Sequence, residues 1–156
     1  MLRRTGIAIA LVGFFLLPTH SGILSAAASG PLEGSWQVMD VGGMPVAGLY
    51  LFAGKHYSMM FATKDRPQID DTNKATADEL RAMWGPMAAN SGTYDISGNL
   101  VTIRPIVAKI PVVMKEGANE VYAFRIEGNI LSLTQQRNAR GVAVQNANTI
   151  RLMRVE

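Results

Sequence analysis

The chain has 156 residues and a formal net charge of +3, from 15 lysines and arginines against 12 acidic residues. It contains no cysteine, which excludes disulfides, thiolate metal sites and cysteine nucleophiles. The length suits one domain with a single hydrophobic core, which must therefore be stabilised by packing alone.

The first 28 residues predict a cleaved secretory signal peptide. Arg3 and Arg4 provide a positive start, residues 6–17 form an unbroken apolar run, and three alanines at 26–28 provide a cleavage site. The apolar run is too short for a membrane span, which needs about 20 residues, and a lipoprotein anchor would need a cysteine. We therefore expect a periplasmic or secreted protein without stable membrane insertion after cleavage.

Cleavage changes the charge balance of the domain that remains, residues 29–156. Without Arg3 and Arg4 it holds 13 basic against 12 acidic side chains, a net charge of +1. No basic stripe is left for phosphates, so the sequence argues against nucleic acid as a partner.

Alternating apolar and polar residues predict eight β-strands in this domain. Trp36 and Val38 share a face of the first strand, and Tyr50, Tyr57 and Met59 share a face of the next two. The predicted strands cover residues 34–41, 49–52, 56–63, 91–97, 100–107, 121–127, 130–136 and 149–155.

A polar segment and one short helix separate the third and fourth predicted strands. Residues 64–74 are mostly polar and predict a loop. Thr76 and Glu79 have the spacing of a capping box, in which each side chain bonds the other residue's backbone N–H. Gly85 and Pro86 then end the helix.

The same hairpin pattern occurs twice, at residues 94–103 and 124–133. Both copies place Gly-Asn between alternating apolar runs, which predicts a two-residue turn at Gly98 and at Gly128. Pairing across the turns sets Tyr94 opposite Ile103 and Phe124 opposite Leu133, on a single apolar face. Successive hairpins form a meander, and closing it removes exposed edges. We therefore expect an all-β fold, an antiparallel up-and-down barrel of about eight strands with one short helix.

Several short motifs resemble those of bacterial lipocalin-like domains, a calycin type of β-barrel. They are Gly-Ser-Trp at 34–36, Gly-Lys-His-Tyr-Ser at 54–58, Asp-Arg-Pro at 65–67, Ser-Gly-Thr-Tyr at 91–94 and Glu-Gly-Asn-Ile-Leu-Ser-Leu at 127–133. The resemblance implies a barrel in which Trp36 closes one end, packed against Arg151 or Arg154. The Thr-Asp-Tyr element of true lipocalins is absent, and Thr-Ile-Arg at 102–104 stands where many relatives carry a histidine. That difference argues against family chemistry that depends on the histidine.

Residues with catalytic or metal-binding chemistry are few. His56 is the only histidine after cleavage, and strand parity turns it away from the apolar face. Asp70 and Asp71 lie in the polar loop, where solvation explains them, and the hairpin pairing sets Arg104 on the outer face. The sequence therefore indicates no catalytic residue, no metal site and no cofactor.

The inward face is rich in aromatic residues and methionine, which either fill the barrel or line a cavity. Buried tyrosines need hydrogen-bond partners, which a ligand pocket provides, so we expect a cavity that binds a small apolar or amphipathic molecule. The candidate ligand-binding residues are Tyr50, Tyr57, Met59, Phe61, Tyr94, Tyr122, Phe124 and Gln135. Two alternatives remain open, namely a cyclase or isomerase with a tyrosine as general acid, and a solid-cored interaction or inhibitor domain that uses loop 64–74.

Overall fold

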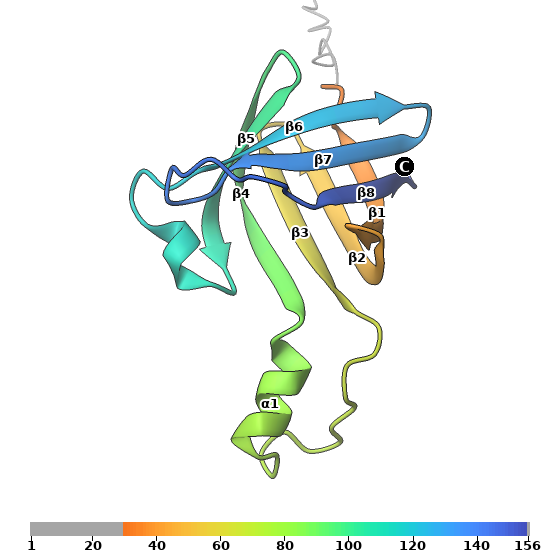
Figure 1. Cartoon of the computed structure of the whole chain (residues 1–156), viewed down its shortest axis with the longest axis vertical. Helices are drawn as coiled ribbons and strands as arrows, with labels where there is room; N and C mark the ends of the chain where they lie inside the picture. Colours follow the sequence, from red (N-terminus) through yellow and green to blue (C-terminus); the bar gives the residue numbers. More distant parts are fainter. Residues whose placement is uncertain (1–29, 156) are drawn as a thin grey trace, which may run out of the picture.

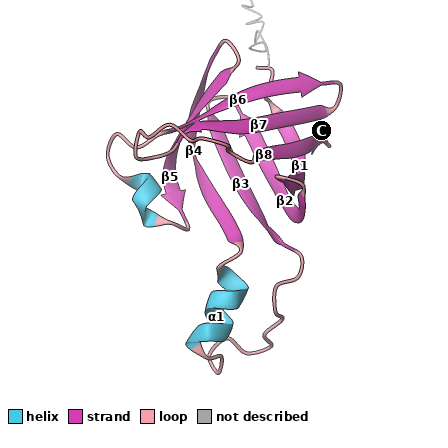
Figure 2. Ribbon diagram, viewed as in Figure 1, coloured by secondary structure: helices cyan, strands magenta, loops and turns pink. Residues whose placement is uncertain are grey.

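A computed structural model describes residues 30–155 as a closed antiparallel barrel of eight strands (Figures 1 and 2). Each strand pairs with its neighbours in chain order, and β1 pairs with β8 to close the barrel. The strands are β1 Gly34–Val41, β2 Met44–Ala53, β3 His56–Thr63, β4 Met87–Ser97, β5 Leu100–Ala108, β6 Glu120–Glu127, β7 Ile130–Arg137 and β8 Thr149–Arg154. The predicted all-β barrel is thus confirmed. The signal peptide predicted for residues 1–28 lies outside the described residues.

Two strands begin four or five residues earlier than the sequence predicts, and β6 begins one residue earlier. β2 starts at Met44 rather than at residue 49, and β4 starts at Met87 rather than at residue 91. Pro45 and Gly48 weaken the local strand pattern of β2, because proline cannot donate to the ladder and glycine has no side chain to pack. Both segments nevertheless belong to the sheet, because they pair with neighbouring strands. Met87, for example, lies opposite Ala62.

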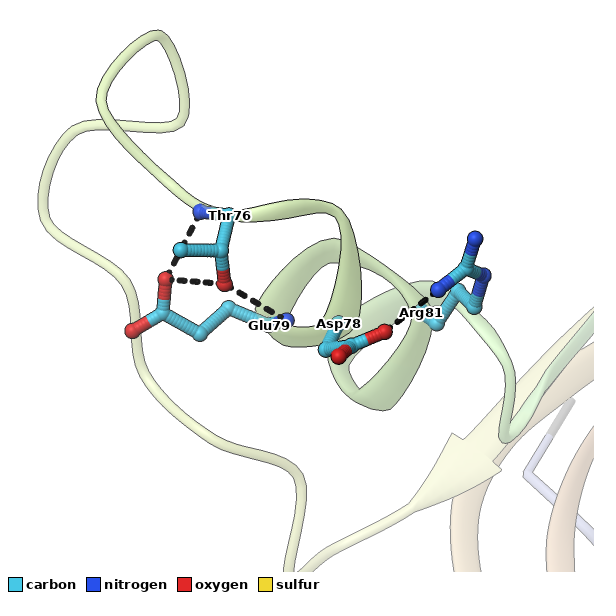
Figure 3. Close-up of polar contacts among 4 residues, drawn as sticks. All are labelled: Thr76, Asp78, Glu79 and Arg81. Atoms are coloured by element: carbon cyan, nitrogen blue, oxygen red, sulfur yellow. Dashed lines mark hydrogen bonds and ion pairs between the residues drawn. The ribbon is translucent and has the colours of Figure 1, made fainter.

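The connection between β3 and β4 contains the helix α1, Ala77–Trp84. Its first turn has the expected capping box, with the Thr76 hydroxyl accepting from the backbone N–H of Glu79 at 3.3 Å and the Glu79 carboxylate accepting from the backbone N–H of Thr76 at 2.7 Å (Figure 3). Arg81 pairs with Asp78 on the exposed surface of the helix. The helix therefore starts where local capping chemistry predicts.

Helix α1 projects away from the barrel on the two chain segments that connect it to β3 and β4 (Figure 1). None of its residues is buried. The Lys109 ammonium stabilises its last turn by donating to the carbonyl oxygens of Gly85 at 3.1 Å and Met87 at 2.8 Å, and also to that of Trp84. A cation at this position also interacts favourably with the negative end of the helix dipole.

The Gly-Asn hairpins form in the predicted register, and their backbone angles identify the turn type. Tyr94 pairs with Ile103 and Phe124 with Leu133, as expected. Gly98 and Gly128 have φ angles of 59° and 57°. The asparagines that follow them do not share this conformation, since Asn146 is the only non-glycine residue with positive φ in residues 30–155. Glycine alone in the left-handed region, at the first central position, matches a type II′ turn rather than the type I′ turn that needs both residues there.

One end of the barrel is closed by Trp36 and the segment that precedes β1. The Trp36 side chain has no solvent exposure, and its indole Nε1–H donates to the carbonyl oxygen of Leu32 at 2.7 Å. The Arg154 guanidinium lies 4.0 Å from the centre of the Trp36 ring and donates to the carbonyl oxygen of Glu33 at 2.6 Å. Arg151 has a different position, on the outer surface, where it pairs with Asp40 at 3.3 Å.

The opposite end, which we call the mouth, carries the longer connections. Three of the four tight hairpins, β2–β3, β4–β5 and β6–β7, turn at the closed end. The links β3–β4, β5–β6 and β7–β8 therefore lie at the mouth, together with the tight β1–β2 turn. The β5–β6 link contains a short 3₁₀ helix, η1 Pro111–Met114, which the sequence did not predict. Any access to the interior at this end is therefore shaped by loops.

Candidate functional site

A cavity of about 210 Å³ lies inside the barrel at the mouth. Its apolar lining comes from strands and from the β5–β6 link, and consists mainly of Met59, Phe61, Ile110, Val113 and Ile150. Its polar lining consists of Tyr50, Asn90, Glu120, Tyr122 and Gln135. An apolar wall with a few converging polar groups is the usual composition of a small-molecule site.

Strand pairing explains why these side chains meet. Tyr50 pairs with Met59, Met59 with Asn90, and Asn90 with Ala108, so one row crosses β2 to β5 at a single level of the barrel. Residues directly opposite each other in paired strands point to the same face. Across the barrel, Tyr122 of β6 pairs with Gln135 of β7.

Glu120, Tyr122 and Gln135 form a hydrogen-bonded cluster in the cavity wall. The Gln135 Nε2–H donates to Glu120 Oε1 at 2.8 Å, and the Tyr122 hydroxyl is 3.4 Å from Glu120 Oε2. Gln135 Nε2 also lies 3.4 Å from the Tyr122 oxygen. Both groups that contact the carboxylate are neutral donors.

Burial dominates the electrostatics of this cluster. It raises the pKa of Glu120 above its ordinary value, and the hydrogen bonds from Gln135 and Tyr122 oppose part of that rise. Burial also raises the pKa of Tyr50, Tyr57 and Tyr122, and the nearby Glu120 carboxylate raises it further. The three phenols therefore keep their protons across the physiological pH range.

Two buried polar atoms of the interior lack a hydrogen-bond partner among residues 30–155. They are the Asn90 Oδ1 and the Tyr57 hydroxyl. Asn90 is only 9% exposed and lines the cavity, whereas Tyr57 is buried beside Phe52 with ring centres 6.5 Å apart. An unpaired buried polar group costs free energy, and because neither oxygen is accessible to solvent, Asn90 lines the cavity with other atoms.

The cavity brings together five of the eight ligand-binding residues predicted from the sequence, which are Tyr50, Met59, Phe61, Tyr122 and Gln135. Tyr57, Tyr94 and Phe124 do not line it. Tyr94 packs edge-on against Phe52 at 5.1 Å between ring centres, as part of the core towards the closed end, and Phe124 packs against that core. The residues of the predicted inward face therefore form a packed core towards the closed end of the barrel and line a cavity at its mouth.

Sequence reasoning missed the two polar cavity residues Asn90 and Glu120, besides several apolar ones. The predicted strands start at residues 91 and 121, one residue after Asn90 and Glu120 respectively. The two residues were therefore not assigned to the inward face. A bulge between Val121 and Tyr122 also breaks the simple inward–outward alternation near Glu120. Glu120 lies two residues before Tyr122, which was predicted to face inward, and this spacing was the signal in the sequence that could have found it.

The remaining candidates lie on the outer surface. His56 is exposed, and the exposed Arg104 pairs with Asp95. No group of three or more histidine, cysteine or acidic side chains able to hold a metal ion occurs within residues 30–155.

A larger hollow, of about 510 Å³, lies over β2 and β3, and it is lined among others by Leu49, Met60 and Arg66. Leu49 and Met60 belong to the outer face of the barrel and are about half exposed. Buried polar groups converge in the smaller interior cavity and not in this groove. We therefore regard the interior cavity as the candidate site.

No model of a known protein family matches this chain, and a search of curated proteins finds no match either. Across residues 30–155 no helix is long and apolar enough to cross a membrane. The barrel geometry and the cavity chemistry therefore carry the functional argument by themselves.

Proposed function

We propose that this protein is an exported lipocalin-like barrel that binds a small apolar or amphipathic molecule in the cavity at its mouth. The observation that carries the proposal is the cavity itself, a mainly apolar hollow of about 210 Å³ whose wall includes the polar side chains of Glu120, Tyr122 and Gln135. Burial of the apolar part of the ligand would supply most of the affinity, and the polar groups would orient it.

The size of the cavity limits the ligand. An engineered apolar cavity of about 150 Å³ in another protein holds benzene, so this cavity suits a single ring with a short chain. 2-Phenylethanol is therefore an appropriate neutral probe, and isothermal titration calorimetry on the purified domain should show one saturable site.

A matched pair of variants locates the binding. Met59→Trp fills the cavity, because Met59 points inward and lines it, whereas Met60→Trp adds the same bulk to the outer face. We expect Met59→Trp to abolish binding of 2-phenylethanol and Met60→Trp to leave it unchanged, with both variants folded by circular dichroism. Equal binding by the two variants would contradict the proposal.

One observation favours a second candidate, a barrel enzyme of the isomerase type. Glu120 is a partly buried carboxyl with a raised pKa that lies within reach of the Tyr122 hydroxyl. A carboxylate in this position would take a proton from a carbon next to a carbonyl group, and the Tyr122 O–H would donate to the enolate oxygen. Deuterium exchange into phenylacetone in D₂O, followed by NMR, tests this, and Glu120→Gln should abolish any catalysed exchange.

The solid-cored interaction domain requires a filled interior, and the cavity counts against it. The feature that supports this alternative is helix α1, which projects from the barrel next to loop 64–74. A protein that binds no small probe would leave it as the better explanation.

A further inference from the structure

The polar groups of the cavity carry a negative formal charge. Of the cavity-lining residues in the described part of the chain, one is acidic, Glu120, and none is a lysine or arginine. The other polar side chains of the wall, those of Tyr50, Asn90, Tyr122 and Gln135, are neutral. A ligand that carries a positive charge therefore fits this wall better than one that carries a negative charge.

The charge of Glu120 has no partner of opposite sign. Within residues 30–155 it forms no ion pair, and its contacts are the Gln135 amide at 2.8 Å and the Tyr122 hydroxyl at 3.4 Å. Burying a carboxylate without a countercharge is unfavourable, whereas a buried carboxylate with a cation and good hydrogen bonds is tolerated. The cavity therefore contains a negative charge that no positive charge within residues 30–155 balances.

Aromatic side chains line the same cavity. Tyr50, Phe61 and Tyr122 all belong to its wall, and the faces of such rings attract organic cations within about 6 Å. A carboxylate combined with aromatic rings is a composition suited to an ammonium group that carries an apolar body.

We propose that the ligand is a small organic amine, bound as its ammonium cation. Its N–H groups donate to the Glu120 carboxylate, and its apolar body packs against Met59, Ile110 and Val113. This inference rests on the proposed binding function and names the class of ligand. A ligand carboxylate is disfavoured, because it would place a second negative charge beside Glu120.

Three probes of nearly equal size separate the ligand classes, namely 2-phenylethylamine, 2-phenylethanol and phenylacetate. A hydrogen bond to a charged group contributes about 1.5–3 kcal/mol, which corresponds to roughly tenfold or more in affinity. At pH 7 and low salt we expect calorimetry to show the amine binding at least about tenfold more tightly than the alcohol, and phenylacetate binding most weakly.

Glu120→Gln is the decisive variant, because it removes the charge and keeps the shape. We expect it to reduce amine affinity to that of 2-phenylethanol while changing alcohol binding little. Glu116→Gln is the matched control, since Glu116 is exposed on the same link between β5 and β6 and does not line the cavity. It should leave the preference for the amine intact.

A pH titration of the parent protein provides an independent measurement if Glu120→Gln does not fold. The groups that face Glu120 are Tyr50, Tyr57 and Tyr122, which stay neutral, and the amides of Asn90 and Gln135. Protonation of Glu120 is then the relevant change as pH falls, and the advantage of the amine over the alcohol should disappear with it. A preference that persists at acidic pH would overturn the inference.

The outcomes distinguish this inference from the proposed function. If 2-phenylethanol binds and the amine binds no better, or if phenylacetate binds most tightly, the amine assignment is wrong while the binding function stands. If none of the three probes binds, both are overturned.

Discussion

The burial of Trp36 makes a single residue responsible for closing one end of the barrel. Its ring is covered by the Arg154 guanidinium, and its N–H is bonded to Leu32. Removing a large buried aromatic side chain leaves a cavity as well as losing apolar burial. The position is therefore expected to be sensitive in a way that an exposed aromatic position is not.

The two tryptophans of the chain offer a matched comparison. Trp36→Ala should lower the free energy of unfolding by about 3–5 kcal/mol, whereas Trp84→Ala, at a position 49% exposed on α1, should change it by less than about 0.5 kcal/mol. Urea denaturation followed by circular dichroism measures both. Equal effects of the two substitutions would mean that Trp36 does not close the barrel.

Glu120 links stability to pH in a defined direction. Burial raises its pKa in the folded state, so the folded state holds the Glu120 proton more tightly than the unfolded state does. The contribution of Glu120 to stability is thus fully present below its unfolded pKa and is lost as pH rises through the folded pKa. Glu120→Gln, which stays neutral, should therefore stabilise the fold near pH 7 and lose that advantage towards pH 4.

Thermal melts of the parent and Glu120→Gln proteins across this pH range test whether the variant is the more stable of the two near pH 7. Glu127→Gln is the control, because Glu127 is exposed and pairs with Arg125 at the surface. A variant that is less stable than the parent at pH 7 would indicate that the ionised carboxylate stabilises the cluster.

At the level of elements, α1 is formed by local chemistry rather than by burial. It buries none of its residues, and its ends are held by the Thr76–Glu79 capping box and by Lys109. An isolated helix of this length is marginal in water, because nucleation is costly. Its stability should thus be separable from that of the barrel.

Thr76→Ala tests this separation. Loss of an N-cap typically costs about 1 kcal/mol of helix stability, so the amides of Ala77–Trp84 should exchange with deuterium faster. The free energy of unfolding of the barrel should stay the same within about 0.5 kcal/mol, because α1 contributes no buried surface to the core. Destabilisation of β3 and β4 amides to the same degree would show that the helix and the barrel are coupled.

The sequence predicted those elements whose determinants are local. The hairpin register around Gly98 and Gly128 and the start of α1 depend on neighbouring residues, and the structure confirms them. The beginnings of β2 and β4 depend on pairing with distant strands, which no local pattern reports. Asn90 and Glu120 both lie before the predicted starts of their strands, so the sequence predicted Tyr50, Tyr122 and Gln135 as polar cavity residues but not these two.

At the level of the whole molecule, the proposed export has a direct consequence for the mature protein. Cleavage after the alanines at 26–28 would leave an N-terminus within a few residues of Ser29, just before Pro31 and Leu32 cross the closed end of the barrel. Mass spectrometry and N-terminal sequencing of the protein recovered from the periplasm or medium should find that terminus. A mature protein that begins at Met1 or Leu2 would contradict the proposal.

The pairing of β1 with β8 delays the closing of the barrel until the end of synthesis. β1 leaves the ribosome early, whereas β8, at Thr149–Arg154, is synthesised after the other seven strands. Until β8 emerges, β1 and β7 each keep an unpaired edge, and Trp36 has no Arg154 to cover it. Contacts between residues so distant in sequence form slowly and late in folding. This late closure would suit the proposed export, because a chain that crosses a membrane unfolded must not complete its fold before it has crossed.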